Sequence, residues 1–175
     1  MPTHVRTTHV TTSSHVAAVH HISFRGLAGA IFILVALSCV LYVIGFSTTA
    51  WAVRGSSYTG LWQRCTCYTV KGADDWFHAV QAMITIGLIG LFIGMLLITL
   101  YLCIHSLACS KSTILLSLTI VCFLSVIFML IGFIIWGIKQ ESDVDFSFGI
   151  TVVASILCLI AGILSLVQMR KSGLA

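Results

Sequence analysis

Residues 113–137 read T-I-L-L-S-L-T-I-V-C-F-L-S-V-I-F-M-L-I-G-F-I-I-W-G and contain no charged side chain. The nearest charges on either side are Lys111 and Lys139. About 20 consecutive apolar residues cross the hydrocarbon core of a bilayer as a helix. Because hydrocarbon satisfies no backbone polar group, a lone spanning segment must satisfy its own groups as a helix. This stretch therefore predicts a transmembrane helix.

The same arrangement recurs three more times along the chain. Asp, Glu, Lys and Arg are absent between Arg25 and Arg54, between Asp75 and Lys111, and between Asp145 and Arg170. The chain is 59% hydrophobic and 8% charged, whereas soluble domains carry about 25% charged residues. We therefore expect an all-α membrane protein, a four-transmembrane-helix bundle with spans near residues 27–49, 78–104, 113–137 and 148–168.

The first span has an alternative interpretation as a cleaved signal peptide, because Ala50-Trp51-Ala52 has the small-x-small form of a cleavage site. Its apolar run is longer than a usual signal core and follows a tail of about 25 residues, which favours a retained helix. Residues 25–172 then form the membrane domain, followed by a short end at 173–175.

An even number of crossings places both termini on one side of the bilayer. That side carries five basic residues and no acid, and the other carries four basic residues and all five acids. The positive-inside rule counts Lys and Arg and so favours cytoplasmic termini by a narrow margin. The outer loops are then about 50–77 and 138–147.

The tail, residues 1–24, is rich in Thr, Ser and His without apolar periodicity, which predicts a disordered cytoplasmic segment. Its five histidines allow a metal-binding interpretation, but their spacing matches no defined ligand pattern. A solvated tail is the expectation we adopt, with no metal and no cofactor.

The first outer loop contains the residues typical of strands. Residues 58–70 are dense in β-branched and aromatic side chains and are punctuated by glycines, which predicts a small extracellular β-sheet. In period-two alternation Trp62, Arg64 and Tyr68 share one face. Trp62 has two readings, a plug for the outer mouth of the bundle or an ordinary interfacial anchor.

Small residues recur at helical spacing in two spans. Between helices in lipid, close approach depends on such residues, so they indicate packing within the bundle or lateral assembly with another chain. They are Gly87, Gly90 and Gly94 in the second span, and Ala154, Cys158 and Gly162 in the fourth.

The remaining cysteines divide by expected location. Cys103 and Cys109 flank the inner end of the second span and are candidates for palmitoylation. Cys65 and Cys67 lie in the outer loop, where an oxidising compartment favours pairing. Their Cα atoms in an extended strand would be about 6.6 Å apart, near the upper limit for a disulfide. A strained bridge and pairing between chains both stay open.

Four landmarks occur in a fixed order along the chain. Trp51 follows the first span, and Gly60-Leu61-Trp62 with Cys65 forms a G-L-W-x-x-C motif. Residues 76–82 read W-F-H-A-V-Q-A at the start of the second helix, and residues 146–149 read F-S-F-G before the fourth. By these four landmarks the chain resembles the claudin, peripheral myelin protein and epithelial membrane protein superfamily. Within the superfamily it most resembles the epithelial membrane protein branch.

The resemblance covers nearly everything after the tail and implies a multi-pass plasma-membrane protein with cytoplasmic termini. Two departures disfavour a paracellular pore. Claudins space their loop cysteines about ten residues apart, whereas one residue separates Cys65 from Cys67, and the C-terminus lacks the Tyr-Val-like ending of many claudins.

Enzymatic activity is not expected, because the loops show no nucleophile–base pair, metal-ligand spacing or phosphate-binding loop. We expect interaction with other membrane proteins, itself in cis or trans included, in adhesion, junctions or membrane organisation, and no nucleic-acid partner. The contacts would come from Leu61, Trp62, Arg64 and Tyr68. The alternative is an auxiliary subunit of an ion channel or receptor, as in the related stargazin-like and calcium-channel gamma proteins, with the acidic turn at residues 141–145 facing a basic partner.

Overall fold

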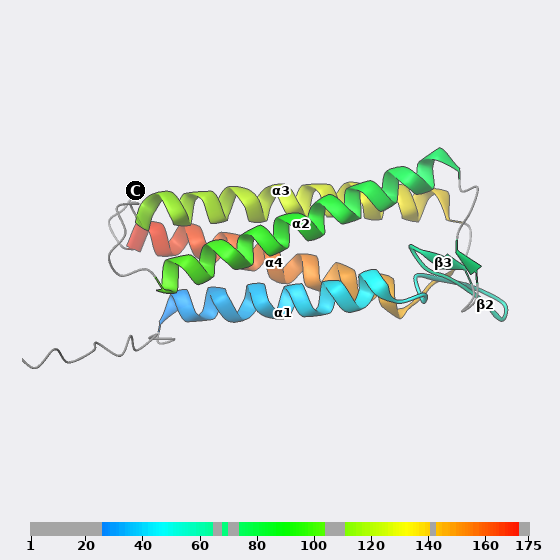
Figure 1. The fold of residues 1–175 in the computed structure, drawn as a ribbon, viewed down its shortest axis with the longest axis horizontal. Helices are drawn as coiled ribbons and strands as arrows, with labels where there is room; N and C mark the ends of the chain where they lie inside the picture. Colours follow the sequence, from blue (N-terminus) through cyan, green and yellow to red (C-terminus); the bar gives the residue numbers. More distant parts are fainter. Residues whose placement is uncertain (1–25, 65–67, 70–73, 104–110, 141–142, 172–175) are drawn as a thin grey trace, which may run out of the picture.

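The computed structural model describes residues 26–64, 68–69, 74–103, 111–140 and 143–171. Four long helices run side by side: α1 Leu27–Ser47, α2 Asp75–Cys103, α3 Lys111–Lys139 and α4 Phe146–Lys171 (Figure 1). Each is long and apolar enough to cross a membrane. The predicted four-helix membrane bundle is confirmed.

Three helices extend beyond the predicted spans: α2 begins earlier than predicted, and α3 and α4 are longer at both ends. The 29 residues of α2 and of α3 give about 43 Å of helix at 1.5 Å per residue, against a hydrocarbon core of about 30 Å. The charged residues Asp75, Lys111 and Lys139 therefore belong to helical turns that protrude from the hydrocarbon. Charge gaps locate the apolar core of a helix but not its ends.

The helices pack as two extensive pairs, α2 with α3 and α1 with α4. Contact between α3 and α4 joins the pairs on one side, and the contact of α1 with α2 is the least extensive of these four. In Figure 1, α2 crosses the bundle obliquely, close to α1 at the end where α2 finishes and away from it where α2 begins.

Hydroxyl groups buried in the bundle donate hydrogen bonds from one helix to a backbone carbonyl of the next. Ser38 Oγ of α1 donates to Ala154 O of α4 over 2.7 Å, and Tyr42 OH donates to Ile84 O of α2 over 3.1 Å. In membrane proteins such bonds contribute about 0.6 kcal/mol on average. They hold α1 against both of its neighbours.

The α2–α3 pair relies instead on small residues. A Cβ at Gly87 would lie 2.6 Å from Met129 Cγ, and one at Gly90 would overlap the Ser125 side chain. These two glycines leave room for the side chains of Met129 and Ser125, which a side chain on α2 would have to displace.

The outward faces of the helices are apolar. Leu96 and Ile134, for example, are 60% and 59% exposed. Lipid tails solvate such faces, and water does not. The chain is therefore a multi-pass membrane protein with its lipid-facing side chains in contact with the bilayer.

A five-stranded antiparallel sheet lies at one end of the bundle, which we call the sheet end (Figure 1). Its strands are β1 Ala52–Arg54, β2 Ser57–Thr59, β3 Gln63–Arg64, β4 Tyr68–Thr69 and β5 Asp143–Val144, in the order β4-β3-β2-β1-β5. The prediction of a small sheet from the loop after α1 is confirmed. Strand β5 was not predicted, and it adds the α3–α4 connection to the same sheet.

Candidate interaction surface at the sheet end

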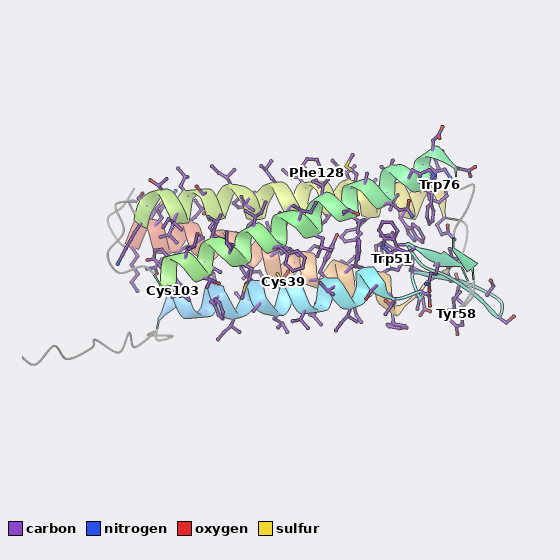
Figure 2. All side chains as sticks on the ribbon, viewed as in Figure 1. Cys39, Trp51, Tyr58, Trp76, Cys103 and Phe128 are labelled. Atoms are coloured by element: carbon purple, nitrogen blue, oxygen red, sulfur yellow. The ribbon has the colours of Figure 1, made fainter. Side chains whose placement is uncertain are left out.

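Trp51 lies at the centre of an aromatic cluster where the sheet meets the bundle, and it is fully buried (Figure 2). Its indole Nε1 donates to Gly45 O over 2.6 Å. This carbonyl lies in the last turn of α1, where helices leave acceptors without an intrahelical partner. Among the described residues, the rings within 6.5 Å of Trp51, centroid to centroid, are those of Phe133, Trp136 and Phe148.

The backbone at residues 50–51 ties the two connections together. Trp51 N donates to Thr59 O of β2 over 3.2 Å, and Trp51 O accepts from Asp145 N over 3.1 Å. Ala50 O accepts from Ser147 N in the first turn of α4 over 3.0 Å. This short segment therefore fixes the sheet relative to both α1 and α4.

Gly60 and Leu61 form the second attachment of the sheet. A Cβ at Gly60 would lie 2.6 Å from Thr49 Cα, so the position requires a residue without a side chain. Leu61 is fully buried, and its carbonyl accepts from Gln81 Nε2 of α2 over 2.7 Å. The first two residues of the G-L-W motif thus clamp the sheet to the membrane domain.

The interpretation of Trp62 as a plug for the bundle is wrong. Trp62 is 42% exposed, and its ring meets the edge of Phe46 at 5.3 Å between centroids. Leu61 and Trp51 fill the mouth instead. Leu61 and Trp62 lie in the tight connection between β2 and β3, in which Leu61 turns into the bundle and Trp62 stays partly exposed beside Phe46.

The outer face of the sheet is set by the strand register. Val53 of β1 pairs with Tyr58 on one side and with Asp143 on the other, so these three side chains share a face. Tyr58 is 47% exposed and Asp143 is exposed, and Figure 2 shows Tyr58 at the far edge of the molecule. Ala52, on the opposite face, is buried. We call Val53, Tyr58 and Asp143 the outer row.

Two residues expected to make contacts belong to a different register row. Arg64 pairs with Thr59 and with Tyr68, and Thr59 pairs with Ala52. The strand register thus places Arg64 and Tyr68 in the same row as Ala52. This row neighbours the outer row along the strands, so neither residue belongs to the outer row.

The small residues of the two spans face other helices of the same chain. Gly94 has Leu118 Cδ1 of α3 at 3.7 Å from the position of a Cβ, and Gly162 has Cys122 Cβ at 3.1 Å. Ala154 and Cys158 are fully buried. The geometry favours packing within the bundle for Gly87, Gly90, Gly94, Ala154, Cys158 and Gly162.

The cysteines are only partly covered by the structure. Cys65, Cys67 and Cys109 lie outside the described residues, and the disulfide and both palmitoylation predictions stay predictions. Cys103 is exposed at the end of α2. The cysteines within the spans, Cys39, Cys122 and Cys158, are buried, and Cys158 Sγ lies 3.8 Å from Cys122 O. The histidine-rich tail is also outside the described residues.

Two residues of this end were not singled out by the sequence. Gln81 occurs in the V-Q-A stretch, yet nothing there indicates that its amide would hold Leu61 O. Gly45 meets α4 closely, since a Cβ there would lie 2.8 Å from Ser147 O. Both roles depend on segments far apart in the sequence.

Within the described ranges, no group of three or more His, Cys, Asp or Glu side chains could hold a metal ion. The sheet end presents exposed aromatic side chains, Tyr58 and Trp62, and the exposed acid Asp143. No family model matches the chain, and a comparison with curated proteins finds no match either.

Proposed function

We propose that this chain is a claudin-like protein of the plasma membrane that acts by binding other membrane proteins in adhesion, junctions or membrane organisation. The observation that carries the proposal is the outer row, displayed on a sheet that is clamped to a four-helix membrane domain. The termini would be cytoplasmic and the sheet extracellular.

The exposure of aromatic side chains on this sheet supports a binding role. Tyr58 and Trp62 are the residue types that most often dominate binding energy at protein interfaces. Tyr58 is 47% exposed and Trp62 is 42% exposed. Trp51 and Leu61, in contrast, are fully buried. A support held in this way loses little conformational entropy when a partner binds.

The composition of the spans supports interaction over transport. Intramembrane charges usually mark the pathway of an ion or substrate. No Asp, Glu, Lys or Arg occurs between the charges that bound each span. The hydroxyls in the bundle are engaged with backbone carbonyls, as in Ser38 and Thr151.

Adhesion can be tested with cells that do not adhere on their own. Cells that express the protein should clump, and Tyr58→Ala should reduce clumping, because truncation of an interface tyrosine typically costs about 2 kcal/mol, or roughly 30-fold in affinity. Phe146→Ala is the matched control, since Phe146 is an exposed aromatic at the same end but in α4. Surface biotinylation would verify equal display. Absence of clumping by wild-type cells would rule out adhesion between membranes.

A second function, an auxiliary subunit of a channel or receptor, is favoured by Asp143. It is exposed in the outer row beside Val53 and Tyr58, whereas Asp145 is engaged with Phe146 N over 2.7 Å. Of the two acids of this turn that the structure describes, Asp143 is therefore the one available to a basic surface of a partner. Purification from native membranes in mild detergent should then recover a large channel in fixed stoichiometry, and Asp143→Asn should weaken its retention. Recovery of self-assembled rings or strands would favour the first function.

A further inference from the structure

The end of the bundle opposite the sheet carries basic residues and no acid. All five acidic residues of the chain, at positions 74, 75, 141, 143 and 145, belong to the connections of the sheet end. At the opposite end the structure describes Lys111, Arg170 and Lys171, all exposed. We call these three residues the basic rim.

The basic rim is gathered around one contact between helices. Ser165 Oγ of α4 donates to Leu115 O of α3 over 3.2 Å. Lys111 lies one helical turn before Leu115 on the same face, and Arg170 and Lys171 lie one to two turns after Ser165. Figure 1 shows the end of α4, in red, beside the start of α3. Three positive charges therefore lie around the junction of two helix ends.

The two ends differ in how their charges are used. At the sheet end Asp145 Oδ1 accepts from Phe146 N over 2.7 Å, and Asp74 Oδ2 accepts from Trp76 Nε1 over 3.1 Å. At the basic rim the chain offers no acidic side chain at all. Lys111 even lies in the first turn of α3, which holds no acid and where the helix dipole disfavours a cation. Lys111, Arg170 and Lys171 therefore have no acidic side chain at this end with which to pair.

We propose that the basic rim binds the headgroups of anionic phospholipids in the leaflet that surrounds it. The guanidinium of Arg170 can engage a phosphate with two parallel N–H donors, and the lysines add point charges. Below the rim, the exposed side chains of Ile163 and Val167 follow α4 into the bilayer. A phospholipid there would lay its acyl chain along these residues and its headgroup against Arg170 and Lys171.

This inference does not depend on the proposed binding role, but its place in the cell rests on the cytoplasmic position of the termini in the proposed function. Anionic lipids are concentrated in the cytoplasmic leaflet, where basic residues next to a membrane span are attracted to them. Binding there would both fix the depth of α3 and α4 and make the protein sensitive to leaflet composition.

The test uses the full chain in mixed micelles of phosphatidylserine and phosphatidylcholine with identical acyl chains. Native mass spectrometry would count the retained lipids. Each rim cation should contribute about fivefold in affinity, which corresponds to about 1 kcal/mol. The triple variant Lys111→Gln, Arg170→Gln, Lys171→Gln should therefore lose roughly 100-fold in phosphatidylserine retention.

The matched control is Lys139→Gln, which removes a cation from the other end of α3 and should leave retention unchanged. Single variants keep the test decisive if the triple variant does not fold, since each should lose about fivefold. Inorganic phosphate should not displace the lipid. Equal retention of both lipids by the wild type, an equal loss in Lys139→Gln, or displacement by inorganic phosphate would each overturn the proposal.

Discussion

Gly60 packs directly against the chain that leaves α1, and one added methyl group tests how the sheet is held. In Gly60→Ala the new Cβ would lie 2.6 Å from Thr49 Cα and 2.8 Å from Thr48 O. Carbon atoms pack at about 3.5–4.0 Å. Both obstacles are backbone atoms, so no side-chain rotation relieves the overlap, and the segments must separate by about 1 Å.

That separation weakens two further interactions. Gly60 N donates to Gln63 O over 2.8 Å, and the adjacent Leu61 is fully buried. Overpacking typically costs about 1–3 kcal/mol, and partial exposure of a leucine side chain adds to that cost. We expect a loss of about 3 kcal/mol, which corresponds to a melting temperature roughly 6–12 °C lower.

Thermal unfolding in detergent would measure the loss, and hydrogen exchange would locate it at residues 59–64. Gly149→Ala is the control, because a Cβ at Gly149 meets nothing within 4 Å and alanine stabilises a helix by about 0.5–1 kcal/mol relative to glycine. If Gly60→Ala melted with the wild type and left exchange at residues 59–64 unchanged, the clamp would not exist as described.

Three further predictions concern the helices. Gly90→Ala should lower stability by about 1–3 kcal/mol, because the methyl would overlap Ser125. Gly137→Ala, in open space, should raise stability by up to about 1 kcal/mol. A change of melting temperature in the same direction for both variants would contradict this. Tyr42→Phe should cost about 0.6–1.7 kcal/mol through loss of the bond to Ile84 O, measured by denaturant titration against Tyr101→Phe. Asp145→Ala should cost about 0.5–2 kcal/mol by uncapping α4, with faster amide exchange in its first turn; unchanged exchange at Phe146 would refute the role.

The spans could be predicted because the rule behind them is local. A stretch such as 113–137 shows its length and lack of charge without knowledge of any neighbour. The strands after α1 were also predictable, since β-branched and aromatic residues between glycines favour extended chain. The helix ends were missed because helices continue into the interface, where charge is tolerated.

The remaining features depend on contacts between distant segments. Strand β5 has only Asp143 and Val144, too few residues for a periodic signal, and it forms because β1 offers a free edge. The structure buries Leu61, and not Trp62, in the mouth of the bundle, and this depends on where Gln81 and Thr49 lie in space. A tryptophan in a motif indicates an interface, but which side of that interface it faces is decided by the fold.

The central claim is that four helices cross one bilayer, with the termini and the sheet on opposite sides. An epitope inserted between Gly55 and Ser56, in the exposed hairpin turn of the sheet, should bind antibody on intact cells. Epitopes at the two termini should bind only after the membrane is permeabilised. If antibody bound only one of the two termini on intact cells, the helix count would be wrong. If antibody bound both termini on intact cells and the hairpin only after permeabilisation, the proposed orientation would be wrong.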